Sequence, residues 1–150
     1  HLLRSQYDAI LTGIGTVLAD DPMLTVRITG LEDRSPLRIV LDRKHRLPND
    51  CNITKTSKQY PTWVLDTPTI EDTISHLTEK GITRLFVEAG QALNTTFLQS
   101  GLVDRIYWFK APHTIGDSGL DMVNDKALLD KFKEIEVVAF PPDTLHILEN

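Results

Sequence analysis

The stretch Asp8-Ala-Ile-Leu-Thr-Gly-Ile-Gly-Thr-Val-Leu-Ala-Asp-Asp-Pro-Met-Leu-Thr-Val-Arg27 contains the features that decide the fold. Its apolar start over 8–12 predicts a strand, and the two glycines that follow permit a tight turn. Residues 16–19 are expected to form one helical turn, which the Asp20-Asp21-Pro22 sequence ends. Residues 24–28 are expected to form another short strand. A strand, a glycine turn and a helix in succession are typical of α/β proteins.

The same alternation continues along the rest of the chain. Strands are expected at 37–41, 62–65, 84–88 and 103–111, and helices at 69–80 and 91–100. Residues 132–140 and 144–148 are expected to pair as a C-terminal β-hairpin, after a loop over 113–119. This order predicts an α/β fold with a mixed, mostly parallel sheet flanked by helices. A single domain over 1–150 is the simplest interpretation.

Composition excludes several classes of protein. A chain of 150 residues with 41% hydrophobic residues can bury a core, and its net charge of -5 argues against nonspecific binding to nucleic acid or an anionic membrane. The only cysteine, Cys51, excludes an internal disulfide and a cysteine-based zinc cluster, and no histidine pair has metal-ligand spacing. No metal site is therefore expected. No apolar run reaches the roughly 20 residues that span a bilayer. We expect a cytoplasmic protein.

Two strand-to-helix turns are candidate ligand sites. One follows the first strand at Thr12-Gly-Ile-Gly-Thr16, and the other is Phe86-Val-Glu-Ala-Gly90, which leads into a helix. Ligands of open α/β sheets bind beyond the carboxyl ends of strands, where a helix N-terminus favours phosphate. Such turns are also common without any ligand, so the pattern alone leaves both interpretations open.

Charged residues lie beside both turns. One carboxylate of the Asp20-Asp21 pair is expected to face a ligand, because adjacent side chains point in different directions. Arg4 and Arg27 flank this region, and the basic run Arg43-Lys44-His45-Arg46 follows a strand, where it could hold the 2′-phosphate of a dinucleotide. Solvated surface groups are the structural alternative.

Taken together, these stretches resemble the reductase domain of the bifunctional riboflavin biosynthesis protein, which has a dihydrofolate reductase-like fold. The matching stretches, in family order, are Leu3-Arg4, Asp8-Ala9-Ile10, Gly15-Thr-Val-Leu-Ala-Asp-Asp-Pro22, Leu24-Thr-Val-Arg27, Pro36-Leu-Arg-Ile-Val-Leu-Asp42, Val87-Glu-Ala-Gly90, Leu102-Val-Asp104, Ala111-Pro112 and Gly116. The Thr-Val-Leu-Ala-Asp-Asp-Pro block is the most specific of them.

The resemblance implies an NADPH-dependent reduction of 5-amino-6-(5-phosphoribosylamino)uracil to its ribitylamino counterpart. By this likeness Arg4, Leu24, Arg27 and Glu88 contact the substrate, with the arginines serving its phosphate. The implied cofactor-side residues are Thr16, Asp20, Arg43, Gly90, Gln91, Ala92, Leu93 and Asn94. Asp20 also lies beside the reacting centre and is the expected catalytic residue. At the Arg43 position a small polar residue also occurs in the family.

The chain departs from the family pattern in two places. It lacks the Pro-Cys-x-x-Cys motif of the zinc deaminase half, so no deaminase activity is expected, although a deaminase domain is expected in the parent polypeptide. The strand and loop upstream of Arg4 are also absent, so the domain is expected to be N-terminally truncated. A homodimer is expected. The alternatives are a related diaminopyrimidinone or pterin reductase, and a noncatalytic module that forms dimers or binds a ligand. The apolar 103–111 strand could bury a partner face in such a module, although it is more often simply core.

Overall fold

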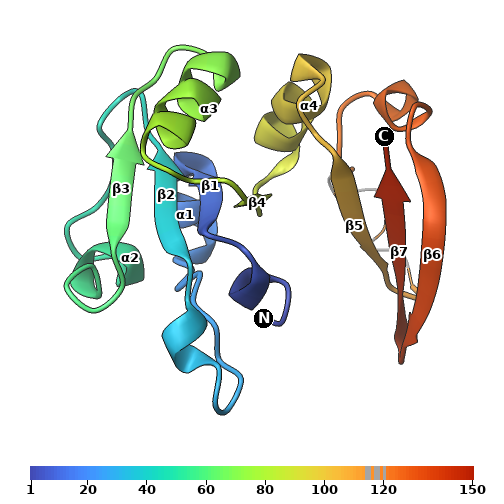
Figure 1. Cartoon of the computed structure of the whole chain (residues 1–150), viewed down its shortest axis with the longest axis horizontal. Helices are drawn as coiled ribbons and strands as arrows, with labels where there is room; N and C mark the ends of the chain where they lie inside the picture. Colours follow the sequence, from blue (N-terminus) through green and yellow to red (C-terminus); the bar gives the residue numbers. More distant parts are fainter. Residues whose placement is uncertain (114–115, 117–118, 120) are drawn as a thin grey trace. The chain divides into compact units, whose positions relative to one another are not determined.

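The computed structural model describes residues 1–113, 116, 119 and 121–150. Residues 114, 115, 117 and 118 of the loop expected over 113–119 lie outside this description. The chain divides into two compact units, His1–Leu93 and Asn94–Asn150 (Figure 1). The single reductase domain expected from the sequence remains a prediction.

The first unit is built on a four-stranded parallel sheet with the strand order β3-β2-β1-β4. The strands are β1 (Ala9–Gly13), β2 (Leu37–Leu41), β3 (Thr62–Leu65) and β4 (Leu85–Val87). β1 is paired on both sides, with β2 and with β4, and it is almost fully buried. Its continuous apolar run therefore reflects burial on both faces of the sheet.

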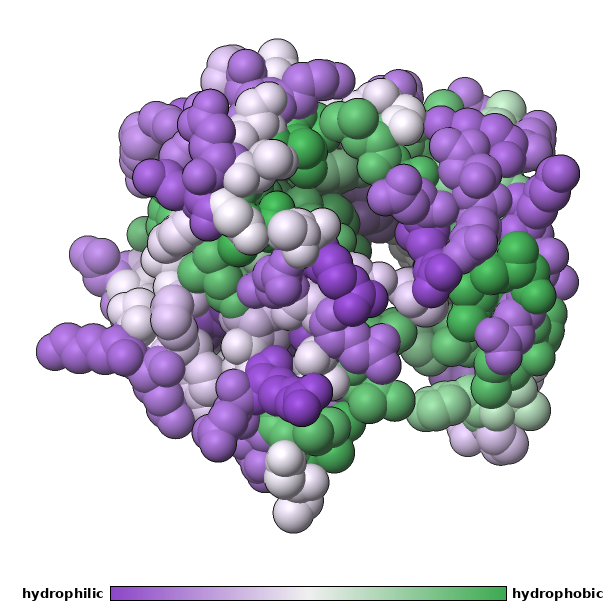
Figure 2. Space-filling view, in the orientation of Figure 1, coloured by the Kyte–Doolittle hydropathy of each residue, from purple (hydrophilic) through white to green (hydrophobic). Residues whose placement is uncertain are grey.

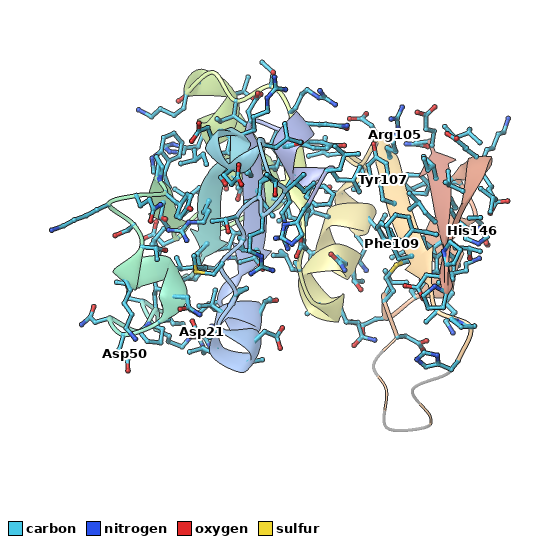
Figure 3. The ribbon with its side chains drawn as sticks, turned by 90° about the horizontal axis from the view of Figure 1, so that it is seen from below. Asp21, Asp50, Arg105, Tyr107, Phe109 and His146 are labelled. Atoms are coloured by element: carbon cyan, nitrogen blue, oxygen red, sulfur yellow. The ribbon has the colours of Figure 1, made fainter. Side chains whose placement is uncertain are left out.

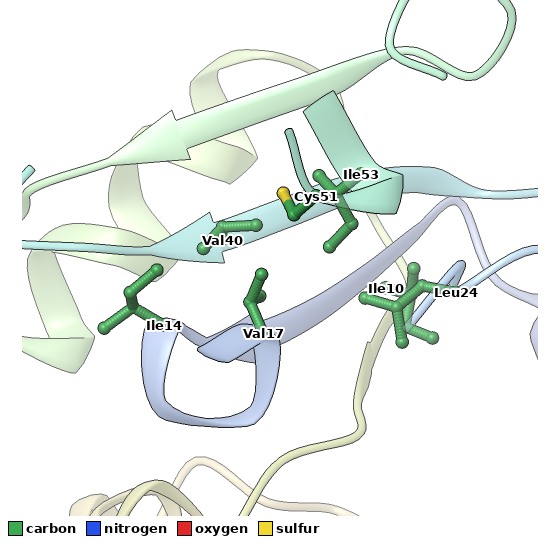
Figure 4. Packing of buried hydrophobic residues seen from close by; sticks show 7 residues of the cluster. All are labelled: Ile10, Ile14, Val17, Leu24, Val40, Cys51 and Ile53. Atoms are coloured by element: carbon green, nitrogen blue, oxygen red, sulfur yellow. The ribbon is translucent and has the colours of Figure 1, made fainter. Parts of the chain in front are cut away.

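Four helices accompany these strands: α1 (Ile14–Asp20), α2 (Asn52–Lys55), α3 (Ile70–Glu79) and α4 (Gln91–Ser100), whose last seven residues belong to the second unit. One hydrophobic cluster of this unit joins α1 and α2 to the sheet (Figure 4). Its buried members are Ile10, Ile14, Val17, Leu24, Val40, Cys51 and Ile53.

Local sequence signals explain the limits of α3. Its N-cap residue is Thr69, whose Oγ1 accepts a hydrogen bond from the Asp72 backbone N–H at 3.0 Å, as the capping-box pattern predicts. Ile70 and Leu77 are buried on one face of the helix. Gly81 follows the helix with a φ of +82°, a conformation that glycine adopts without steric cost.

The second unit contains a three-stranded antiparallel sheet with the order β5-β7-β6. Its strands are β5 (Arg105–Lys110), β6 (Lys133–Phe140) and β7 (Asp143–Glu149). The expected hairpin is thus confirmed, and it forms a hydrogen-bonded sheet with β5. Its hydrophobic core includes Leu98 of α4, together with Val123, Phe132 and Leu148. Two short 3-10 helices, η1 (Arg4–Gln6) and η2 (Glu32–Arg34), lie in the first unit, and η3 (Lys126–Leu129) lies in the second.

Three local expectations are corrected. Residues 24–28 form no strand, because Leu24 has a φ of 54° and the chain turns there. α1 covers seven residues rather than one turn. The helix α2 was not expected, since Asn52–Lys55 is too short for a hydrophobic repeat to show in the sequence.

Candidate functional site

The two strand-to-helix turns predicted as ligand sites lie side by side. β1 and β4 are hydrogen-bonded neighbours in parallel, so their carboxyl ends meet at one edge of the sheet. A Cβ atom added to Gly90 would lie 3.8 Å from the Thr16 Oγ1, and one added to Gly13 would lie 3.3 Å from Leu93 Cδ2. The distance at Gly13 is tighter than most Cβ contacts, so a side chain there would require Leu93 to shift, whereas the distance at Gly90 is an ordinary contact.

The remaining predicted cofactor-side residues of this edge follow Gly90 directly. Gln91, Ala92 and Leu93 form the first turn of α4 within the first unit, and Asn94 is the first residue of the second. The helix dipole places partial positive charge at this end of α4. An edge with two adjoining turns and a helix N-terminus is suited to an anionic ligand such as a dinucleotide.

The two adjacent aspartates have different surroundings. Asp21 ends α1 with a φ of 41°, and its Oδ1 accepts a hydrogen bond from the Asn52 backbone N–H at 2.7 Å. Figure 3 shows Asp21 between α1 and α2. Asp20 is exposed and lies four residues after Thr16, hence on the same face of α1. Asp21 is therefore engaged with α2, whereas Asp20 is exposed, and a ligand role for Asp20 stays a prediction.

Arg4 and Glu88, both predicted to bind substrate, form a bidentate ion pair. Arg4 Nη2 donates to Glu88 Oε1 at 2.6 Å, and Arg4 Nε donates to Oε2 at 2.9 Å. Arg4 Nη1 also donates to the Thr25 carbonyl at 2.9 Å. The guanidinium therefore joins the carboxyl end of β4 to the segment that contains Leu24 and Arg27. In this structure all three guanidinium nitrogens of Arg4 donate to acceptors within the protein.

Leu24 and Arg27 differ in their exposure. The Leu24 side chain is buried in the hydrophobic cluster that joins α1 and α2 to the sheet, so it is not accessible to a ligand. Arg27 is exposed, and its Nη2 lies 3.3 Å from His1 Nε2. His1 Nδ1 and Arg4 Nη1 both contact the Thr25 carbonyl, so Arg27 and the Arg4–Glu88 pair lie beside the same segment of the chain.

The basic run after β2 is ordered by a buried carboxylate that the sequence interpretation did not select. Asp42 is fully buried, and its Oδ2 accepts hydrogen bonds from the backbone N–H groups of Arg46 and Leu47. Arg43 is exposed, and its Nε donates to the Thr67 carbonyl at 2.9 Å. The run therefore lies at the same carboxyl edge of the sheet, beside the loop that follows β3.

Another residue missed by the sequence interpretation is Arg38, a fully buried arginine within β2. Its Nη1 donates to the Met23 carbonyl at 3.1 Å, which links the sheet to the segment between Asp20 and Arg27. An arginine inside an otherwise apolar strand is the signal that could have identified it, because arginine is rarely fully buried.

The described residues contain neither a candidate metal cluster nor a membrane-spanning helix. Within residues 1–113, 116, 119 and 121–150, no three His, Cys, Asp or Glu side chains group so as to hold a metal ion. No helix in this part of the chain is long and apolar enough to cross a membrane.

Comparison with known proteins identifies a family and several relatives. Residues 1–146 match the RibD C-terminal domain. The riboflavin biosynthesis protein RibD of Escherichia coli K12 is 33% identical to this chain over 99% of the chain and 50% of its own length. The 2,5-diamino-6-ribosylamino-4(3H)-pyrimidinone 5′-phosphate reductase of Archaeoglobus fulgidus is 31% identical over 76% of the chain and 66% of its own length.

A solved structure shares the fold. The diaminohydroxyphosphoribosylaminopyrimidine deaminase/5-amino-6-(5-phosphoribosylamino)uracil reductase of Thermotoga maritima is similar with a TM-score of 0.83 and 28% identity, over 99% of this chain and 47% of that one. The expected dihydrofolate reductase-like α/β fold is confirmed by this likeness. The chain spans 44% to 50% of the length of three RibD relatives, about half of each.

Proposed function

We propose that this chain, which belongs to the family of RibD C-terminal domains, catalyses the NADPH-dependent reduction of 5-amino-6-(5-phosphoribosylamino)uracil to 5-amino-6-(5-phosphoribitylamino)uracil in riboflavin biosynthesis. The observation that carries the proposal is the junction of the two turns at Thr16 and Gly90, beside the Arg4–Glu88 pair. The relatives named above as RibD and as pyrimidinone phosphate reductases support the reaction class.

The carboxyl edge of the first unit fits a dinucleotide. Gly90 carries no side chain opposite Thr16, and the positive end of α4 follows it, so a pyrophosphate can approach the backbone there. The exposed, basic run from Arg43 to Arg46 fits the 2′-phosphate that distinguishes NADPH from NADH. When bound, NADPH would supply the hydride. The residues of this chain then orient the two reactants and transfer the proton.

Arg4 and Arg27 have different roles in substrate binding. Arg27 is exposed and is therefore assigned to the substrate phosphate. Arg4 instead holds the Glu88 carboxylate, whose side chain is 41% exposed and can accept hydrogen bonds from a pyrimidine ring. Asp20, exposed one helical turn after Thr16, is assigned to the reacting centre, where it accepts or returns a proton.

A second candidate substrate is 2,5-diamino-6-ribosylamino-4(3H)-pyrimidinone 5′-phosphate. The relative from Archaeoglobus fulgidus that carries this name is 31% identical, only slightly less than the RibD protein of Escherichia coli. Both substrates carry a ribosylamino group and a phosphate, so the same residues serve either. Steady-state kinetics with the two compounds, followed by the loss of NADPH absorbance, distinguishes them by kcat/KM.

The test of the catalytic assignment is the variant Asp20→Asn, with Asp21→Asn as its matched control. Asp20→Asn is expected to lower kcat by about a hundredfold or more, because a positioned acid or base contributes about 10²–10⁴. Asp21→Asn keeps an oxygen that accepts from Asn52 and tolerates the left-handed backbone, so it is expected to retain activity. Full activity of Asp20→Asn would remove Asp20 from the mechanism.

NADPH binding is tested separately from turnover. Titration is followed by energy transfer from Trp63 of β3 to the bound nicotinamide, with NADH as the comparison. A preference for NADPH that falls in the variant Arg43→Ala supports the placement of the 2′-phosphate. The absence of saturable binding by either nucleotide would contradict the reductase proposal.

We further propose that the protein is a cytoplasmic homodimer whose parent polypeptide includes a deaminase domain. The deaminase half is supported by the two activities named for the Thermotoga maritima relative. The dimer is supported by Phe109 and Phe140, whose rings lie 6.0 Å apart while 49% and 60% exposed. Figure 2 shows hydrophobic residues at the surface over the strands of the second unit. A monomeric mass at all concentrations in analytical ultracentrifugation would refute the dimer.

A further inference from the structure

Arg38 uses its whole guanidinium to join separate segments of the first unit. It donates to five acceptors, which are the carbonyls of Met23, Ile53 and Tyr60 and the hydroxyls of Thr56 and Thr62. These distances lie between 2.8 and 3.1 Å, and the guanidinium also stacks 5.5 Å from the Tyr60 ring. An arginine has five N–H donors, so the set is saturated. β2, α2, the start of β3 and the segment after α1 meet at this one side chain.

Packing alone does not account for an arginine at this place. The side chain is fully buried, and its recorded partners in the described chain are carbonyls and hydroxyls rather than a carboxylate. Burial accordingly lowers the pKa of Arg38. A buried charge carries a desolvation penalty that an apolar side chain of similar size avoids. An apolar residue could fill the same space but could not make these hydrogen bonds. The hydrogen bonds are therefore the specific contribution of Arg38.

One of those bonds holds a strained segment of the proposed substrate site. Between Asp20 and Arg27 the backbone is left-handed at Asp21 and at Leu24, with φ of 41° and 54°. Non-glycine residues adopt this conformation at a cost, and they keep it only where surrounding contacts hold it. Met23 lies between the two residues, and its carbonyl is the one that Arg38 binds.

A second contact holds the same segment from α2. Asn52, the first residue of α2, donates from its backbone N–H to Asp21 Oδ1 at 2.7 Å and from its Nδ2 to the Asp21 carbonyl at 2.8 Å. Arg38 in turn binds α2 through the Ile53 carbonyl and then Thr56, which follows the helix. The short helix α2 is thus attached both to Asp21 and to the guanidinium that fixes Met23.

We propose that Arg38 and Asn52 form a clamp that positions the 20–27 segment, so that Asp20, the Leu24 backbone and Arg27 are held in place for the pyrimidine substrate. The two residues act through the segment and do not touch the substrate, so they are positioning residues. This assignment rests on the function proposed above. It adds to that function the reason why a short helix and a buried arginine lie behind the substrate segment.

The test compares Arg38→Lys and Asn52→Ala with the matched control Thr73→Val in the full chain. Lysine keeps the charge but has three donors instead of a planar fork, and Asn52→Ala removes only the bond to the Asp21 carbonyl. Thr73 is also fully buried and hydrogen-bonded, to Thr67 and to the Thr69 carbonyl, but it lies in α3. All three variants lose side-chain hydrogen bonds, and only the first two loosen the clamp.

Two measurements are made on each variant. Hydrogen exchange read by mass spectrometry reports the order of the 20–27 segment and needs no activity. Steady-state kinetics and NADPH titration report whether that order matters for substrate. In Asn52→Ala we expect faster exchange confined to the 20–27 segment, and in Arg38→Lys faster exchange there and in the 53–62 stretch that Arg38 also binds. In both variants we expect a KM for the pyrimidine raised about threefold to tenfold and an unchanged NADPH affinity. Thr73→Val is expected to change neither exchange in this segment nor KM.

The outcomes distinguish failure of the clamp from failure of the proposed reductase function. Unchanged exchange at 20–27 in Asn52→Ala overturns the clamp, and so does faster exchange with an unchanged KM. Asn52→Ala alone decides the matter if Arg38→Lys does not fold. If the wild-type chain turns over neither pyrimidine substrate, the proposed function is wrong. The exchange data then still show whether Arg38 and Asn52 hold the segment.

Discussion

The geometry of the Arg4–Glu88 ion pair predicts how strongly the two residues are coupled in the stability of the first unit. The perturbations are Arg4→Met, Glu88→Gln and the double variant, which together form a double-mutant cycle. Glu88→Gln is expected to destabilise the first unit more than Arg4→Met does. The Arg4 side chain is only 16% exposed and would keep its charge without a carboxylate partner, whereas the 41% exposed Glu88 can be hydrated once Arg4 is removed.

The size of the coupling follows from the contact and from its exposure. The pair is bidentate at 2.6 and 2.9 Å, and hydrogen bonds to charged groups contribute about 1.5–3 kcal/mol when they are well shielded. Pairs open to solvent contribute about 0.2–1 kcal/mol. Because more than a third of the Glu88 side chain is exposed, we expect a coupling free energy of about 1–2 kcal/mol.

The assay is urea unfolding followed by Trp63 fluorescence in a Trp108→Phe background, so that the signal comes from the first unit. With a slope of about 1–2 kcal/mol per molar urea, the coupling corresponds to a midpoint change of about 1 M. The control is the same cycle on Arg105 and Glu149, an ion pair across the exposed β5–β7 strands, followed by Trp108 in a Trp63→Phe background. Its coupling is expected to be smaller, since water screens both charges.

Additive effects in the Arg4–Glu88 cycle, within about 0.3 kcal/mol, would refute this reasoning. They would mean that Arg4 does not hold Glu88 in solution and that its guanidinium is available to a ligand. A phosphate-binding role for Arg4, as the family resemblance implies, would then be favoured over the role as a partner of Glu88.

Two further predictions concern the frame around the site. Gly13→Val is expected to lower stability by about 1–3 kcal/mol, because even a Cβ there lies 3.3 Å from Leu93, whereas Gly15→Ala, with open space and a helical position, is expected to gain about 0.5–1 kcal/mol; equal urea midpoints for the two variants would contradict this. Hydrogen bonds from the Thr83 backbone and hydroxyl lower the pKa of Asp8 below 3.8, so Asp8 stabilises the fold above that pH and this contribution is lost as pH falls through the lowered pKa. The stability difference between wild type and Asp8→Asn should therefore be present at pH 6 and shrink below about pH 4 in urea unfolding; a difference that grows on acidification would overturn the assignment.

Much of the first unit could be predicted from local patterns. The apolar runs gave β1, β2 and β3 within a residue or so, and Thr69 with Asp72 marked the start of α3. The prediction of a strand over 24–28 was wrong. Leu24, at its start, has a left-handed backbone, and hydrophobic alternation carries no signal for such a residue. The helix α2 was not predicted, because four residues are too few to show a helical hydrophobic period.

Sequence by itself determined which residue types stand at the carboxyl ends of the strands, because each glycine turn and charge directly follows an apolar run. It could not determine their pairing. That Thr16 meets Gly90 depends on β1 lying next to β4, which are separated by more than 70 residues of chain. Only the tertiary structure decided that Arg4 binds Glu88, that Asp21 is engaged by Asn52 while Asp20 is exposed, and that Leu24 is buried. It also showed that Arg38, one residue of an apolar strand, is buried and bonded to several separate segments. The physical reason is that hydrogen bonds and charge pairs depend on distance in space, whereas local sequence patterns record only distance along the chain.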